Sequence, residues 1–214
     1  GLENVLWFAN NKEDAHEEPT IKRSRSHDYV SKEVINVREN VGLIEVANFS
    51  KHEFKGPDAR KFLDHIMAGR LPRPGRISLS PMLSYRGKLC GDLTVACLDE
   101  NEFMVFGSGA AQEMHRRWFE SHLDKFDLSY SNRSDDYHGL SIAGPNSRKV
   151  LEKIVRDDVS NEKFKFRDSR RMFVGGVPAI INRISFTGEL GYEIYVAPHY
   201  QLKLYEELME AGKE

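Results

Sequence analysis

The sequence contains little cysteine, almost no net charge and no long hydrophobic run. Its 214 residues include 2 cysteines and 8 histidines, in no spacing that matches a zinc site, so we expect no metal. The 31 Lys and Arg residues nearly balance the 33 Asp and Glu residues, which argues against non-specific nucleic-acid binding. No apolar run approaches the ~20 residues that cross a membrane, and no secretory signal is recognised at residues 1–10, so we expect no membrane partner.

The two cysteines fall in one predicted strand. Because Cys90 and Cys97 are an odd number of positions apart, we expect them on opposite faces of that strand, where they cannot form a disulfide with each other. Two free thiols fit a reducing compartment. We therefore expect a soluble protein of the cytoplasm or the mitochondrial matrix.

Short predicted strands come as hairpins interleaved with helices. The predicted helices are residues 29–37, 56–69, 110–123, 144–155 and 199–209, and residues 71–77 are interpreted as a loop. The predicted strands are residues 43–46, 52–55, 80–85, 88–97, 102–107, 126–130, 138–143, 169–174, 177–185 and 192–197. This order is typical of an α+β fold with antiparallel sheets rather than a doubly wound parallel sheet.

Two segments of the chain are alike. G-P-D-A-R-K-F-L-D-H-I at residues 56–66 and G-P-N-S-R-K-V-L-E-K-I at residues 144–154 share six of eleven positions. A shared helix start explains Gly-Pro followed by Asp or Asn, but not the remaining identities. We infer two related halves, residues 41–136 and 137–214, which follow a polar lead-in and first helix at residues 1–40.

Two acidic residues stand inside otherwise apolar strands, each beyond a turn that contains glycine. Asp92 follows the turn at residues 86–88, and Glu193 follows the turn at residues 187–191. Burying an unpaired carboxylate is costly, so each must face water, a partner or a ligand. One interpretation is two solvated strand faces. The other is a shared cavity for a cationic amine or a donor-rich heterocycle, because an ionised carboxylate offers only acceptors.

Other candidate motifs carry less weight. Gly107-Ser108-Gly109 follows a predicted strand and opens a helix, but Gln112 stands where a dinucleotide loop needs its third glycine. We interpret this segment as a tight turn with amides free to contact a ligand. No serine has the G-x-S-x-G setting of a hydrolase. His115 and His122 lie two helical turns apart, too far to bind one metal ion.

The order of the motifs resembles the folate-binding, aminomethyltransferase-like region of dimethylglycine dehydrogenase and sarcosine dehydrogenase, which is akin to the glycine-cleavage T-protein. The segments that carry the resemblance are G-L-E-N-V-L-W-F-A, V-G-L-I-E-V, G-P-D-A-R-K-F-L-D-H, P-M-L-S-Y-R-G-K-L-C-G-D-L-T-V, S-I-A-G-P-N-S-R-K-V-L and S-F-T-G-E-L-G-Y-E-I-Y. The last segment and the one with Asp92 are the most specific. The resemblance implies a T-protein-like fold of two ferredoxin-like antiparallel halves with packed helices, truncated at Glu214 before the family's terminal barrel.

The resemblance also implies an activity and its residues. Asp92 matches the family's catalytic carboxylate, which assists the attack of tetrahydrofolate on an iminium carbon, and Glu193 matches the acid that holds the pterin ring. Such roles fit the chemistry, because a carboxylate can accept adjacent N–H donors or a proton and can stabilise a cation electrostatically. Phe186 stands where many members have tyrosine. The positions similar to the family's folate-lining segments are Leu79, Leu83 and Gly107.

We therefore expect a tetrahydrofolate-dependent one-carbon (aminomethyl) transfer domain. It would capture the iminium or formaldehyde-level carbon released by demethylation of dimethylglycine or sarcosine, giving 5,10-methylenetetrahydrofolate. FAD is expected only in a partner domain, because the amino terminus carries no flavin-binding G-x-G-x-x-G. One alternative is a non-catalytic folate-binding or regulatory relative of the same fold. Another is a folate-binding iron–sulfur assembly protein, against which the cysteine-free F-T-G-E-L-G turn argues.

Overall fold

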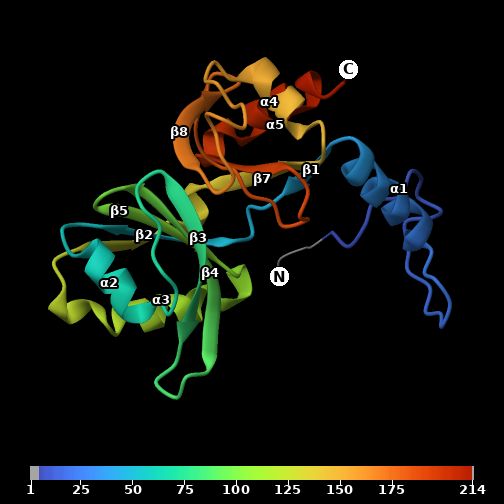
Figure 1. Cartoon of the computed structure of the whole chain (residues 1–214). Helices are drawn as coiled ribbons and strands as arrows, with labels where there is room; N and C mark the ends of the chain where they lie inside the picture. Colours follow the sequence, from blue (N-terminus) through green and yellow to red (C-terminus); the bar gives the residue numbers. More distant parts are fainter. Residues whose placement is uncertain (1–4, 214) are drawn as a thin grey trace.

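The structure is a computed structural model that describes residues 5–213 and contains two five-stranded antiparallel sheets (Figure 1). Sheet A has the order β1 (Gly42–Glu45), β7 (His138–Ala143), β10 (Gly191–Val196), β9 (Val177–Asn182), β8 (Ser169–Val174). Sheet B has the order β3 (Arg76–Leu83), β4 (Leu89–Asp99), β5 (Glu102–Gly107), β2 (Ser50–Lys55), β6 (Ser129–Asn132). The α-helices are α1 (Ser26–Glu39), α2 (Ala59–Ile66), α3 (Gln112–Glu120), α4 (Ser147–Ile154) and α5 (Gln201–Ala211). The predicted α+β class is confirmed, and within residues 5–213 neither sheet closes into a barrel.

Strand alternation separates the buried side chains into three layers. In each outer layer, the side chains on one face of a sheet pack against two helices. Helices α4 and α5 cover sheet A, and α2 and α3 cover sheet B (Figure 1). The strand residues that do so include Tyr192, Ile194 and Val196 on β10 and Leu93, Val95 and Cys97 on β4. Tyr195 on β10 and Ala96 on β4 point the other way, into a third cluster between the two sheets. Both faces of the central strands are therefore covered.

The layer between the sheets is centred on two stacked aromatic rings. The ring centroids of Phe106 on β5 and Tyr195 on β10 lie 4.6 Å apart with an interplanar angle of 29°. At the rim of this layer, Arg171 Nη2 donates to Glu102 Oε1 at 2.6 Å, and Arg76 pairs with Asp168. Apolar contact in the middle and ion pairs at the rim join the two sheets into one body.

The chain crosses from sheet A to sheet B between β1 and β2, and one lysine fastens this crossing. Lys51 is fully buried, and its Nζ donates to the carbonyl oxygens of Ala47 at 2.6 Å and Phe49 at 2.7 Å. The same ammonium lies 5.9 Å from the centroid of the Tyr195 ring. The crossing segment is thus bonded to the layer between the sheets.

The sequence repeat corresponds to a repeated strand–turn–helix unit. Each bound of α4 lies 88 residues after the matching bound of α2. Gly56 and Gly144 precede these helices with φ of 139° and 128°, a conformation that side chains disfavour, which explains why both are glycine. The expected helix caps are wrong, however. Asp58 accepts from the Asp127 amide at 3.1 Å, and Asn146 donates to Asn40 Oδ1 at 2.8 Å, so both side chains join neighbouring segments instead.

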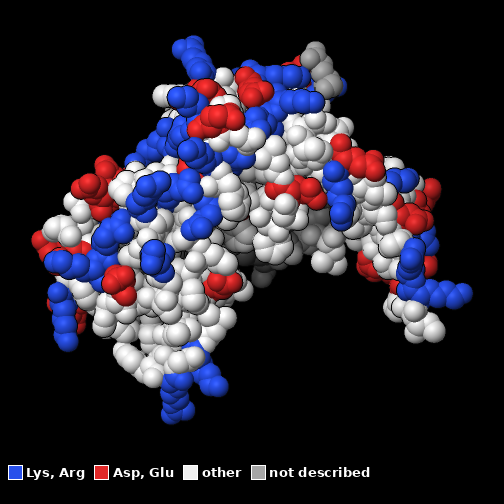
Figure 2. All heavy atoms as spheres, in the orientation of Figure 1, with Lys and Arg blue, Asp and Glu red and all other residues white. Residues whose placement is uncertain are grey.

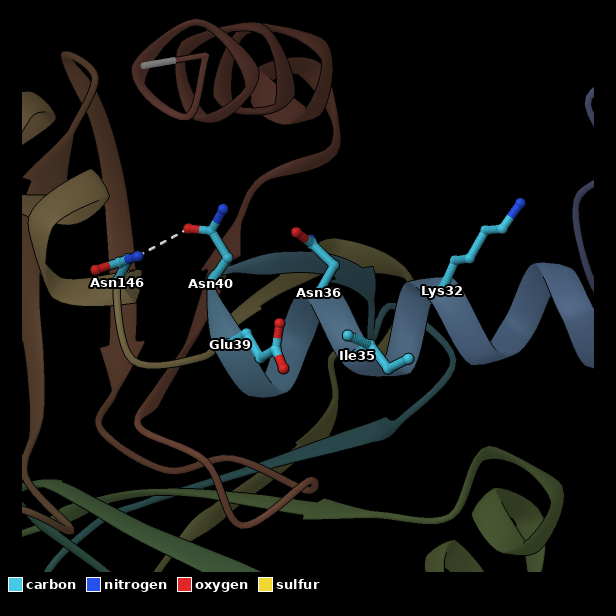
Figure 3. Close-up of a pocket in the computed structure, with 6 residues that line it drawn as sticks. All are labelled: Lys32, Ile35, Asn36, Glu39, Asn40 and Asn146. Carbon is cyan, nitrogen blue, oxygen red and sulfur yellow. Dashed lines mark hydrogen bonds between the residues drawn. The ribbon is translucent and has the colours of Figure 1, made fainter.

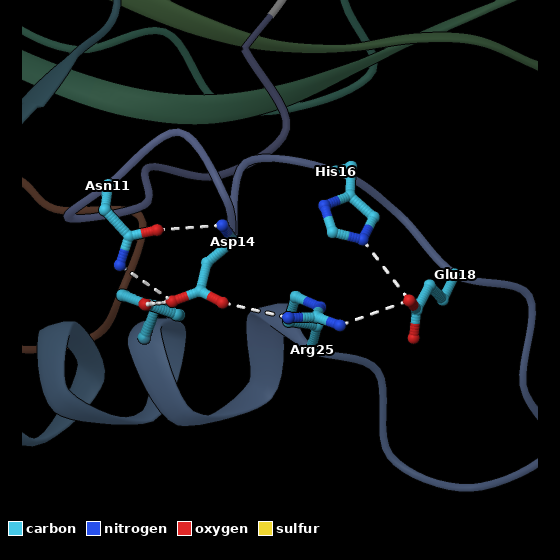
Figure 4. A network of polar contacts seen from close by, with 6 residues as sticks. Asn11, Asp14, His16, Glu18 and Arg25 are labelled. Carbon is cyan, nitrogen blue, oxygen red and sulfur yellow. Dashed lines mark hydrogen bonds and ion pairs between the residues drawn. The ribbon is translucent and has the colours of Figure 1, made fainter.

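Helix α1 extends away from the two sheets and buries none of its residues (Figure 1). The lead-in packs against this helix through the rings of Trp7 and Tyr29, whose centroids are 5.3 Å apart. Asp14 accepts from the Tyr29 hydroxyl at 2.6 Å and from Arg25 Nη1 at 2.9 Å (Figure 4). At 14 residues α1 is the longest described helix, and none of the helices in residues 5–213 combines the length and the apolar character needed to cross a membrane.

The packing of neighbouring elements decides three local features. In α3 the buried side chains are His115 and Phe119, whereas Met114 is 46% exposed. The first strand residues of β3 lie inside the expected loop 71–77, because Ile77 pairs with Ala96 in the sheet. β1 pairs with β7, so a strand from the predicted first half belongs to the sheet of the second. The division at residues 40, 136 and 214 stays a prediction.

The buried histidine of sheet B makes the stability of the fold depend on pH. His52 is fully buried, packs on the Phe119 ring with centroids 5.0 Å apart, and bonds through Nδ1 to the Tyr130 hydroxyl at 2.9 Å. Burial lowers the pKa of His52 from 6.5 to about 4, and the neighbouring His115 adds to this effect while Glu113 opposes it. The folded state therefore holds this imidazole in its neutral form.

We expect the chain to lose about 3 kcal/mol of unfolding free energy as the pH falls from 6.5 to 4, because the unfolded state binds a proton that folded His52 refuses. Urea unfolding at several pH values measures this loss. The His52→Gln variant, which keeps a polar partner for Tyr130 without a titrating group, should lose less over the same range. Parallel pH profiles for the two proteins would contradict the assignment.

Candidate functional site

The two acidic residues singled out in the sequence lie on facing surfaces of the two sheets. Glu193 is two residues from Tyr195 on β10, so its side chain is on the face that points toward sheet B. Asp92 is four residues from Ala96 on β4, so its side chain is on the face that points toward sheet A. Each carboxylate thus lies on the strand face that is turned toward the other sheet. That they share one ligand stays a prediction.

Glu193 is held in a buried setting. It is 8% exposed, and its Oε2 accepts a hydrogen bond of 2.9 Å from the Tyr195 hydroxyl. Burial raises the pKa of Glu193 above its usual value, and the bond from Tyr195 opposes this only in part. A carboxylate offers further acceptor sites besides the bond from Tyr195, and these suit a ligand with adjacent N–H groups.

Asp92 stands in a more open setting beside apolar side chains. It is exposed on β4 and pairs in register with Pro81 on β3. Leu79 and Leu83, on the same face of β3 as Pro81, are 62% and 37% exposed. Exposed apolar side chains next to a carboxylate form a surface suited to a flat ligand that carries an amine.

Two of the expected folate-lining residues lie in an exposed turn and at a closely packed strand end. Phe186 lies in the turn between β9 and β10 and is 92% exposed. Gly107 ends β5, and a Cβ atom placed on it would meet Leu93 Cδ2 at 2.6 Å and His115 Nδ1 at 3.1 Å. Close packing against Leu93 of β4 and His115 of α3 therefore explains this glycine, and only its backbone is available to a ligand. Their roles in folate binding stay predictions.

Sequence reasoning missed a row of polar residues beside Glu193. In sheet A, Glu193 on β10 pairs with Ser141 on β7 and with Asn182 on β9. Ser141 is 6% exposed and Asn182 is fully buried. Polar residues at three paired positions of buried strands indicate a binding site. The sequence alone does not reveal them, because the pairing depends on the strand register.

The cysteines are arranged differently from the expectation that they lie on opposite faces. Cys97 is buried in the core between sheet B and its helices, and Cys90 packs against the same core. The pairing of β3 with β4 shifts register after Met82, opposite Cys90, and this bulge reverses the alternation. Both thiols are free. Within residues 5–213, no cluster of three His, Cys, Asp or Glu side chains could hold a metal ion.

The surface has two hollows near α1. One, of about 530 Å³, lies where α1 meets the start of α4 and contains the bond between Asn146 and Asn40 (Figure 3). The other is a groove of about 880 Å³ between α1, β1 and α5, which Thr187 and Glu189 from the turn before β10 also line. Figure 2 shows the molecule hollowed between the lobe of sheet B and α1, with mostly uncharged atoms at its border. None of the expected site residues lines either hollow.

Comparison with known proteins identifies the family. The model of the GCVT N-terminal domain matches residues 1–214. The chain belongs to this family. It is 34% identical to mouse mitochondrial dimethylglycine dehydrogenase over 217 residues, covering all of this chain and 25% of that protein. It is 32% identical to the sarcosine oxidase alpha subunit of Rhizobium meliloti, again over all of this chain and 22% of the relative.

Shorter relatives and a solved structure agree with this assignment. The chain is 31% identical to an aminomethyltransferase of Halothermothrix orenii, covering 83% of this chain and 50% of that one. The crystal structure of aminomethyltransferase T of the glycine cleavage system from Bartonella henselae superposes with a TM-score of 0.74 at 22% identity, over 83% of this chain and 48% of that one. This likeness shows the T-protein fold expected from the sequence. The chain spans about a quarter to a half of the length of these relatives.

Replacing the buried acid should stabilise the protein in the absence of ligand. Because the folded pKa of Glu193 is raised, its contribution to stability is full at acid pH and is lost as the pH rises through that pKa. We expect Glu193→Gln to melt at a higher temperature than the parent at neutral pH, and this gain to vanish on acidification. A gain that is independent of pH would contradict the buried carboxylate as its cause.

Proposed function

We propose that this chain is a tetrahydrofolate-dependent aminomethyl-transfer domain that acts on a carbon at the iminium or formaldehyde level. The observation that carries the proposal is the placement of Asp92 and Glu193 on facing surfaces of two sheets, in a chain of the GCVT family. The two acids differ in burial, and the transfer reaction needs two different roles from them. One acid is buried and suited to holding a heterocycle, and the other is exposed and suited to a reacting amine.

The residues of the site fit a reduced pterin. Glu193 has acceptor capacity beyond its bond from Tyr195, which matches the adjacent N–H donors on a pterin edge. The exposed Leu79 and Leu83 supply apolar contact for its flat ring. Tetrahydrofolate supplies the amine nitrogens that take up the one-carbon unit.

The two acids then have separate tasks. Glu193 accepts the pterin donors and fixes the orientation of the ring. Asp92 orients the reacting amine, accepts its proton and favours the positive charge of the carbon donor. A carboxylate that performs these tasks typically contributes ~100- to 10,000-fold in rate.

The partner that produces the carbon would be an FAD-bearing domain or subunit. Dimethylglycine dehydrogenase and the sarcosine oxidase alpha subunit are about four to five times as long as this chain. Because these relatives are named for dimethylglycine and sarcosine, the proposed source of the carbon is demethylation of one of these two amines. The mitochondrial relatives and the two free cysteines support a location in the mitochondrial matrix or the cytoplasm.

We expect the 214-residue chain to bind tetrahydrofolate in a calorimeter. Glu193→Gln should weaken binding about 10- to 100-fold, since hydrogen bonds to a charged group are lost. Asp92→Asn should change binding less than about threefold. Glu100→Gln, at the exposed turn between β4 and β5, is the matched control and should bind like the parent.

If no tetrahydrofolate binds, either to this chain or to a longer protein that contains it, the site assignment is wrong. The non-catalytic relative of the same fold would then be the better account. Equal affinity of the parent and Glu193→Gln would remove Glu193 from the folate site.

The role of Asp92 is tested with an FAD-bearing dehydrogenase partner that supplies the carbon. Asp92→Asn should leave amine oxidation unchanged and slow the formation of methylenetetrahydrofolate about 100-fold. Reductive titration of the flavin and product assay measure the two steps separately. An equal loss in both steps would show that Asp92 acts through the fold rather than in the transfer.

A further inference from the structure

Three polar side chains form a straight row across the face of sheet A that points toward sheet B. Ser141 on β7 and Asn182 on β9 pair with the two sides of Glu193 on β10, and directly paired residues of antiparallel strands share a face. Neighbouring strands are ~4.8 Å apart, so the row spans ~10 Å. Its middle member is the acid proposed to hold the pterin.

Asn182 carries a donor that the fold leaves without a partner. Its Oδ1 accepts from the Ser169 hydroxyl at 2.7 Å, on the β8 side. Its Nδ2 has no acceptor within residues 5–213, although the residue is fully buried. Leaving a buried donor unpaired costs about 1–3 kcal/mol, so such groups in native proteins usually have a ligand, ion or water as their partner.

Ser141 offers a second donor on the other side of Glu193. It is 6% exposed, and its hydroxyl makes no hydrogen bond with any described residue. The row therefore presents a free hydroxyl, a carboxylate and a free amide in the order donor, acceptor, donor. A ligand that fits this order has two donors flanked by acceptors.

We infer that Asn182 and Ser141 extend the site of Glu193 and select the oxo form of the pterin ring. The hydrogen-bonding edge of that ring presents a carbonyl oxygen, a ring N–H, an amino group and a ring nitrogen. Glu193 accepts from the two central donors, Asn182 donates to the carbonyl, and Ser141 donates to the ring nitrogen. This inference rests on the proposed function and adds a basis for its ligand selectivity.

The consequence is discrimination between pterins that differ at the carbonyl position. Where an amino group replaces the carbonyl, its N–H points at the amide of Asn182, and two donors face each other. A site built to hydrogen-bond one group rejects an analogue that leaves its buried polar atoms unpaired. The row thus favours the oxo ring and disfavours the diamino ring.

Folic acid and aminopterin test this selectivity, because an amino group in aminopterin replaces the carbonyl of folic acid. The adjacent ring nitrogen of aminopterin also lacks its hydrogen, so Glu193 loses a donor as well, and the part due to Asn182 is read from the Asn182 variants. The parent chain should bind folic acid more tightly by calorimetry. Asn182→Ala should lower the affinity for folic acid about 3- to 10-fold and should raise or leave unchanged that for aminopterin, because it removes one of two opposed donors. Ser141→Ala should lower both affinities by a similar factor of about 3, since both ligands have the ring nitrogen. Ser78→Ala, on β3 of sheet B, is the control and should change neither, because the Ser78 hydroxyl donates to the backbone carbonyl of Arg70.

Asn182→Leu, which matches the side-chain volume without polar atoms, repeats the measurement with less disturbance of the packing. Thermal melting confirms that each variant is folded. Equal changes for both ligands in the Asn182 variants, or a parent that does not distinguish them, would overturn the inference while leaving the proposed function in place. A parent that binds neither ligand nor tetrahydrofolate would instead overturn the proposed function.

Discussion

The stacked rings of Phe106 and Tyr195 are the contact on which the rest of the arrangement depends. They fix the spacing of the two sheets, because the ring centroids are 4.6 Å apart. Closer approach of the sheets would make the rings clash, and rotation or separation would break the stacking. Tyr195 has a second task, since its hydroxyl donates to Glu193. One side chain therefore couples the packing of the two halves to the orientation of the buried acid. A change that loosens the contact would disturb both.

The sheets explain how an acid can be retained inside a buried strand. The helix-facing side of β10 supplies Tyr192, Ile194 and Val196 to the core, and this apolar burial offsets the cost of Glu193 on the opposite side. The unpaired amide of Asn182 adds to that cost. Local features that lower stability while presenting polar groups in one place are typical of sites shaped for a ligand.

The sequence was sufficient where a strand is short and regular and lies between clear turns. The bounds of β5, β7 and β8 agree with those expected, as do the apolar residues of α2. Effects that arise between elements were not predictable. The bulge opposite Cys90, the burial of His115 and the polar row beside Glu193 each depend on strand register or on a neighbouring element. The two acids stood out as local exceptions to the strand pattern, whereas Asn182 lay within the predicted strand 177–185 and was not singled out.

The buried lysine at the crossing between the sheets has a consequence for how a ligand is recognised. Lys51 bonds the carbonyls of Ala47 and Phe49, and burial lowers its pKa to about 8. These bonds hold the segment that joins β1 to β2, so a shift of one sheet against the other would have to break them and expose a buried ammonium. A ligand that fits the sheets at their present spacing avoids this cost, whereas a ligand that needs them further apart does not.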